Sequence, residues 1–297
     1  MSSPIHVIWY TDPHNIWCWG FEPTIRRLEV RYPDAVRIET RQGGLFEDFS
    51  PVREQWARMS GGRWKDSVRA FFEAVSSQHR MPMNADAMLD SSDDFNSTWP
   101  ACIAAKAADL QGPDQGWRYL RRLREAWCLE GRGIHLKDVQ ADVAKESGLN
   151  VDAFVQALDD GSANEAFQRD RDECQALGIS GFPTFVIRRD DETRQVDGWR
   201  PWDAFEEILR DVEPHLEAAS LKANEETALN LLQRYGILAT TELAAVLGTT
   251  DDDAEILLEE LEGRDDVIRR PIGRRLMWEL PTRRVGTSKA NVASHSS

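Results

Sequence analysis

The segment from Tyr10 to Gly20, which reads YTDPHNIWCWG, constrains the fold of this chain more than any other. It follows an apolar run at residues 5–10, which predicts a strand, and it leads into residues 17–32, where apolar side chains recur on one helical face. A cysteine at the start of a helix sits in the partial positive charge of the helix N-terminus, which stabilises a thiolate. The segment therefore predicts an α/β domain with Cys18 as its candidate reactive group.

The next segments extend this α/β pattern. Residues 36–42 alternate between apolar and charged side chains, which predicts a second strand and a β-α-β unit. A long, mostly helical region follows at residues 51–174, with an irregular polar stretch at residues 81–94. A strand at residues 194–198 and a helix from Pro201 to Leu209 are expected near the end of the domain.

Asp12-Pro13 and Trp17-Cys18-Trp19-Gly20 resemble the active-site segment of the DsbA-like branch of the thioredoxin superfamily. That family carries two cysteines in this segment, and the attacking cysteine would stand where this chain has Asn15. The resemblance implies an α/β thioredoxin-like fold with a large helical insertion at about residues 51–175. The two-cysteine exchange cycle, which needs an attacking thiolate and a resolving partner, is not available within the segment.

Two further regions carry the resemblance. Residues 97–102 and 123–127 are similar to segments of the family's helical insertion. Residues 178–187, GISGFPTFVI, resemble the Gly-x-Pro-Thr-Phe segment, in which a cis proline faces the active-site cysteine. This implies that Pro183 is cis and that the Phe182 backbone pairs with an extended peptide or glutathione. We therefore expect a site whose substrate-binding residues are Trp17, Trp19, Phe182 and Thr184.

The expected catalytic residues are Cys18, Asn15, His14 and Pro183, and three of them have a structural alternative. Cys18 is either a reactive thiol or a small buried side chain. Asn15 is either a helix N-cap or a hydrogen-bond donor to a bound thiol; the kappa-class glutathione transferases and 2-hydroxychromene-2-carboxylate isomerases, which this segment also resembles, place a serine there. His14 either adds positive charge that favours a thiolate or is an exposed turn residue. The two tryptophans suit packing as well as a binding groove.

The other cysteines, Cys102, Cys128 and Cys174, form no Cys-x-x-Cys pair. A disulfide framework or a structural zinc site is therefore not expected, and no metal is assigned. Cys102 is the remaining candidate for a partner of Cys18, whereas Cys128 and Cys174 are expected to be buried. No cofactor is expected, although the resemblance allows glutathione as a co-substrate.

A second unit is expected at residues 221–281, after a thioredoxin-like domain at residues 1–220. Helices at residues 224–235, 240–247 and 250–261 and a hairpin at residues 267–280 resemble a winged helix. Its third helix begins Thr-Thr-Asp-Asp-Asp, and this acidic start would repel nucleic-acid phosphates, so protein contact or domain packing is the favoured role. Residues 282–297 are rich in Ser, Thr and Arg and are expected to be a disordered tail.

The formal net charge is −15, and lysine is scarce beside arginine. This composition is typical of proteins from a high-salt cytoplasm, and it disfavours nucleic-acid and anionic-membrane partners. The sequence shows neither a long apolar run nor a signal-like N-terminus, so a cytoplasmic protein is expected.

Three functions follow from these observations. The first is a DsbA-like thiol-disulfide oxidoreductase that acts through Cys18 alone or handles glutathione, with protein thiols, peptide thiols or glutathione as partners. The second is a non-catalytic adaptor, because the same branch includes cytoplasmic adaptors that deliver Spx to a protease. The third, less favoured, is a redox-sensing DNA-binding regulator.

Overall fold

The computed structural model describes residues 3–281. Its main sheet contains β1 (Ile5–Thr11), β2 (Val36–Gln42), β3 (Thr184–Arg189) and β4 (Glu192–Asp197) in the order β2-β1-β3-β4. β1 runs parallel to β2 and antiparallel to β3, and β4 is antiparallel to β3. The predicted α/β thioredoxin-like sheet is confirmed, and β4 begins two residues before the predicted strand.

The predicted helix at residues 17–32 is two helices, α1 (Ile16–Trp19) and α2 (Glu22–Arg31). The break has a local cause. Pro23 has no N–H to donate to the carbonyl of Trp19 four residues earlier, so it fits only in the first turn of a new helix. The cysteine-containing helix is therefore a single turn, held between the turn at Asn15 and the start of α2.

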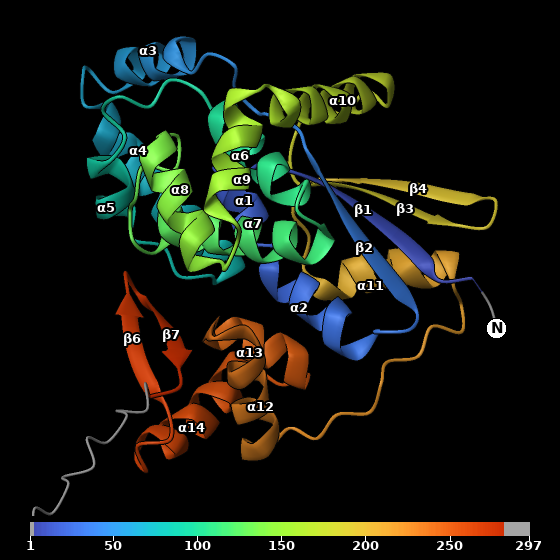
Figure 1. The fold of residues 1–297 in the computed structure, drawn as a ribbon. Helices are drawn as coiled ribbons and strands as arrows, with labels where there is room; N and C mark the ends of the chain where they lie inside the picture. Colours follow the sequence, from blue (N-terminus) through green and yellow to red (C-terminus); the bar gives the residue numbers. More distant parts are fainter. Residues whose placement is uncertain (1–2, 282–297) are drawn as a thin grey trace, which may run out of the picture.

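The helical insertion lies against one end of this sheet (Figure 1). Its core is built from small and aromatic side chains of α6, α7 and α9, including Ala104, Tyr119 and Phe154. The stretch at residues 81–94, predicted to be irregular, contains the short helix α5. The helices of the insertion are α3 (Ser50–Met59), α4 (Trp64–His79), α5 (Ala85–Asp90), α6 (Trp99–Asp109), α7 (Pro113–Cys128), α8 (Lys137–Glu146), α9 (Val151–Asp159) and α10 (Ser162–Ala176).

A smaller unit follows α11 (Trp202–Val212) and a connecting segment. It consists of α12 (Glu225–Tyr235), β5 (Ile237–Ala239), α13 (Thr240–Leu247), α14 (Asp251–Glu262), β6 (Ile268–Ile272) and β7 (Arg275–Glu279). The three strands form a sheet in the order β5-β7-β6, and β5 was not predicted. α13 packs on α2, and Met277 joins the apolar core of the insertion (Figure 1). The winged-helix assignment and the domain boundaries stay predictions.

The predicted tail at residues 282–297 lies outside the described residues. Within residues 3–281, no helix combines the length and the apolar character that crossing a membrane requires.

Candidate functional site

The turn between β1 and α1 is held by the buried carboxylate of Asp12. Its Oδ1 accepts from the N–H of His14 at 2.8 Å, and its Oδ2 accepts from the N–H of Leu45 at 2.8 Å. The thiol of Cys102 lies 3.5 Å from the same Oδ2. Burial, together with the neighbouring Asp12 carboxylate, raises the pKa of Cys102 well above its usual value. Cys102 is thus a protonated donor to Asp12, and both Cys18 and Cys102 are free and buried, so a partnership between them stays a prediction.

Asn15 is the N-cap of α1, as one of its two interpretations predicted. Its Oδ1 accepts from the N–H groups of Trp17 at 2.9 Å and Cys18 at 3.2 Å. Its Nδ2 donates to the carbonyl of Phe182 at 3.0 Å, a contact that the sequence did not indicate. Asn15 therefore ties α1 to the loop before Pro183. Because this carbonyl already has a donor, part of the backbone pairing expected for Phe182 is made by the chain itself.

Cys18 does not have the properties of a nucleophile. Its side chain is 0% exposed and packs in an apolar core with Trp9 and Phe21. Burial raises the pKa of the Cys18 thiol to about 12, although the positive charge of Arg124 acts in the opposite direction. The expectation of a thiolate stabilised by the helix N-terminus is wrong, because α1 has a single turn and the desolvation of Cys18 outweighs its effect.

His14 is neutral near pH 7. Its ring lies 4.8 Å from the ring of Phe95 and 5.2 Å from that of Trp127, measured between centroids. Both ring nitrogens are inaccessible to solvent and have no hydrogen-bond partner among residues 3–281. Burial, with a smaller contribution from His135, lowers the pKa of His14 to about 3. The predicted histidinium is therefore absent at neutral pH, and the alternative of an exposed turn residue is also wrong.

Only part of the predicted substrate-binding set can be reached. Trp19 is completely buried, and its Nε1 donates to the carbonyl of Pro82 at 2.8 Å. The Thr184 side chain is also buried, and its Oγ1 donates to the carbonyl of Gly181 at 2.8 Å. Both side chains are structural, whereas Trp17 and Phe182 are only partly buried. Two of the four predicted substrate-binding residues are thus accessible from solvent, and a binding role for them stays a prediction.

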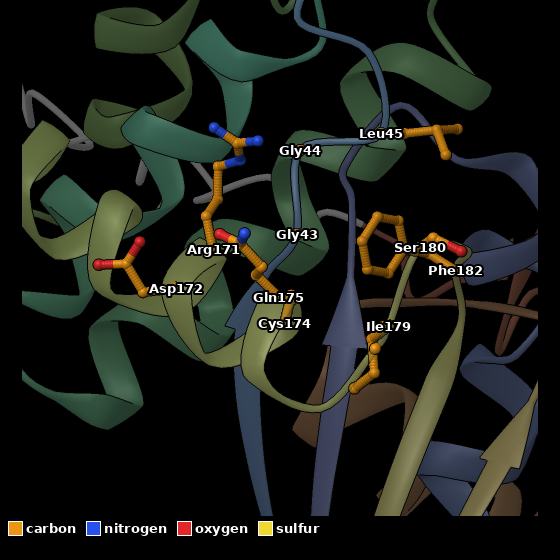
Figure 2. A pocket seen from close by; sticks show the side chains of 11 residues that line it. Gly43, Gly44, Leu45, Arg171, Asp172, Cys174, Gln175, Ile179, Ser180 and Phe182 are labelled. Atoms are coloured by element: carbon orange, nitrogen blue, oxygen red, sulfur yellow. The ribbon is translucent and has the colours of Figure 1, made fainter.

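A cavity of about 530 Å³ lies beside the loop that precedes Pro183 (Figure 2). The Phe182–Pro183 bond is cis, as predicted. The Phe182 ring packs so closely on Gly43 that a Cβ there would lie 1.8 Å from the ring. On the other side, α10 contributes Arg171 and Cys174 to the wall. Cys174 is 5% exposed, and burial raises the pKa of its thiol to about 12, so no thiolate lines this cavity near neutral pH.

A buried cluster of charges next to α1 was missed by the sequence analysis. Arg124 donates to Glu22 at 2.6 Å, and Arg121 donates to Glu242 at 2.7 Å. Burial acts to raise the pKa of Glu22, but the attraction of the surrounding arginines outweighs it, and the pKa is lowered. The signal was present in residues 123–127, where charged residues stand between apolar ones on a helix that would be buried. The cluster joins α2, α7 and α13.

Comparison with known proteins gives matches along most of the chain. A family profile described as thioredoxin matches residues 9–207. The "ClpXP adapter protein SpxH" of Shouchella clausii is 32% identical over 281 residues, which cover 94% of this chain and 89% of that protein. The SpxH protein of Halalkalibacterium halodurans is 28% identical over 265 residues, which cover 87% and 83% of the two chains.

A solved structure has the same fold. The cytosolic disulfide reductase DsbM of Pseudomonas aeruginosa superposes with a TM-score of 0.53 at 22% identity, and the match covers 69% of this chain and 98% of that one. The chain therefore belongs to the thioredoxin family, and it shares a family with the SpxH protein of Shouchella clausii.

Proposed function

We propose that this chain is a non-catalytic adapter that binds a protein client in the cytoplasm and presents it to a ClpXP-type protease. The observation that carries the proposal is the burial of Cys18 beside an asparagine in the position of the attacking cysteine. Burial raises the pKa of the Cys18 thiol and shields it from a substrate, so it offers no accessible thiolate for exchange chemistry near pH 7. The relatives named as ClpXP adapters support the same conclusion.

The thiol-disulfide oxidoreductase is the less favoured function. It would need a thiolate that a substrate can reach, and all four cysteines are buried and unpaired. It would also need free backbone groups before Pro183, and the carbonyl of Phe182 accepts from Asn15. The DNA-binding function is disfavoured, because the first turn of α14 carries Asp251, Asp252 and Asp253, which would repel the phosphates of DNA.

The test is reconstituted degradation of an Spx-type client by ClpXP from the same organism. Addition of the chain should shorten the half-life of the client severalfold. The variant Cys18→Ala should stimulate degradation as well as the natural chain does, since the thiol takes no part. Neither protein should reduce insulin disulfides. Loss of stimulation in a folded Cys18→Ala variant, or measurable insulin reduction that needs Cys18, would overturn the proposal in favour of the oxidoreductase.

A further inference from the structure

A second cavity, of about 330 Å³, lies between the turn before α1 and the helices α3 and α4. Its size is at the lower end of the range for ligand sites, about 300–1,000 Å³. No Asp, Glu, Lys or Arg lines it, and His14 at its wall is neutral near pH 7. The cavity therefore suits one bulky apolar group. The aromatic residues around it are Trp17, Phe46, Phe49, Trp56, Phe71, Phe72, Phe95 and Trp127.

The apolar surface continues outside this cavity. α3 buries none of its residues, and it lies with α4 at the outer edge of the helical insertion (Figure 1). The rings of Trp56 on α3 and Phe71 on α4 are 5.8 Å apart, and Phe71 is 40% exposed. At the end of α3, Met59 is 78% exposed. Exposed apolar side chains at and near a cavity mark interaction sites, and the exposure of Phe71 and Met59 favours a polypeptide over a small molecule.

The two helices also differ from the rest of the chain in charge. Residues 50–79 contain five Lys and Arg residues and three Asp and Glu residues, a net charge of +2, whereas the whole chain has −15. Among residues 3–281, Arg63 at the turn between α3 and α4 has no ion-pair partner. Asp93 and Asp86, which lie outside residues 50–79, pair with Lys65 and Arg69, so Arg53 and Arg63 supply the positive charge that remains to attract an acidic segment.

We propose that α3, α4 and the cavity beside them form a docking site for a client segment in which one bulky aromatic side chain is flanked by acidic residues. The aromatic side chain fills the cavity, and the acidic residues lie along Arg53 and Arg63, whereas Arg58 and Arg69 already pair with Glu54, Asp66 and Asp86. The proposal rests on the adapter function, because it names the chemistry of the client segment that such an adapter would hold.

The test uses the full chain and a fluorescein-labelled nonapeptide, Asp-Glu-Asp-Leu-Trp-Leu-Glu-Asp-Glu, followed by fluorescence anisotropy. The same peptide with alanine in place of tryptophan should bind about 30-fold more weakly, as expected when a buried aromatic anchor is removed. The peptide with lysine in place of every acidic residue should not bind. Raising the salt concentration should weaken the binding of the tryptophan peptide, because the contacts of its flanking residues are between exposed charges, which salt screens.

Two matched variants locate the site. Val52→Trp fills the cavity from α3 and should weaken binding at least tenfold, whereas Gln55→Trp adds the same side chain to an exposed position of the same helix and should leave it unchanged. Arg63→Glu should weaken binding at low salt and have no effect at high salt. Equal binding by Val52→Trp and Gln55→Trp, or equal binding of the tryptophan and alanine peptides, would overturn the proposal. Binding of 2-naphthol, but of neither peptide, would replace it with a small-molecule site.

The two proposals can fail separately. If the natural chain does not stimulate ClpXP at all, the adapter function fails whatever the peptides do. If the natural chain stimulates degradation and Val52→Trp stimulates it equally, the adapter function stands and the client docks elsewhere.

Discussion

At the scale of single residues, Asn15 stabilises the local fold at the position where the related enzymes have their attacking cysteine. One amide group accepts from two N–H groups of α1 and donates to the loop that carries Pro183. A cysteine at this position could do neither as well, because a thiol is a weak acceptor and a weak donor. The residue that stands in place of the attacking thiol therefore also links α1 to the loop before Pro183.

His79, which is buried, and His14, whose ring nitrogens are inaccessible to solvent, make the stability depend on pH. Burial lowers the pKa of His14 to about 3 and that of His79 to about 4, from an unfolded value of 6.5. Between these values the unfolded chain binds more protons than the folded chain, so the free energy of unfolding should fall as the pH decreases below 6.5. The slope should approach about 1.4 kcal/mol per pH unit for each histidine.

Urea denaturation between pH 7 and pH 5 measures this slope. His14→Phe should reduce the slope relative to the natural chain, because it removes one of the two titrating rings while preserving an aromatic side chain. His215→Gln, which removes a histidine from an exposed position, is the matched control. If His14→Phe and the natural chain had the same slope, the pKa of His14 would be the same in the folded and unfolded states, and the prediction would be wrong.

At the scale of elements, the junction of α2, α7 and α13 depends on Glu242. Its carboxylate, which is completely buried, accepts two hydrogen bonds from Arg121 at 2.7 and 3.0 Å and one from the N–H of Ala239 at 2.8 Å. Arg121 in turn lies 4.7 Å from the Trp19 ring. A buried ion pair thus attaches the smaller unit to α7, the helix next to the candidate site. Removing one partner of such a pair is destabilising, because the other charge is left buried.

Glu242→Gln should therefore loosen the smaller unit. The substitution removes the anionic partner of Arg121 on α13 while Glu22 and Glu125 still pair with Arg121, and we expect a loss of about 1.5–3 kcal/mol in the free energy of unfolding. Hydrogen exchange in residues 225–279 should become faster than in the main sheet. Glu226→Gln, which removes the same charge from an exposed position on α12, is the control. Similar exchange in the two variants would mean that apolar packing alone holds the unit.

At the scale of the whole molecule, the net charge of −15 implies repulsion within the folded chain. We expect the melting temperature to rise by a few degrees as KCl increases from about 0.01 M, and to level off near 0.3 M, where the screening length is only a few Å. Calorimetry over a KCl series checks this. A melting temperature that is flat or falls over the same range would contradict it, and would also count against the predicted high-salt origin.

The sequence by itself determined the architecture of the main domain. The alternating pattern at residues 36–42, the apolar run at residues 5–10 and the segment around Pro183 are local signals, and each led to the observed strand or cis bond. The N-cap at Asn15 was also a local inference, because the side chain reaches only the next two or three N–H groups. The break between α1 and α2 was not predicted, because the apolar face is continuous across it and Pro23 is the local signal that opposes a single helix.

Only the tertiary structure decided whether these residues can react. The state of Cys18 depends on burial by Trp9 and Phe21 and on the charge of Arg124, which is more than a hundred residues away in the sequence. His14 is neutral because Phe95 and Trp127, from two other parts of the chain, enclose its ring. Desolvation is a property of everything that surrounds a group, and a linear pattern contains little of that information. The motif therefore specified the position of the thiol, and the packing of distant segments decided that it stays protonated and out of reach.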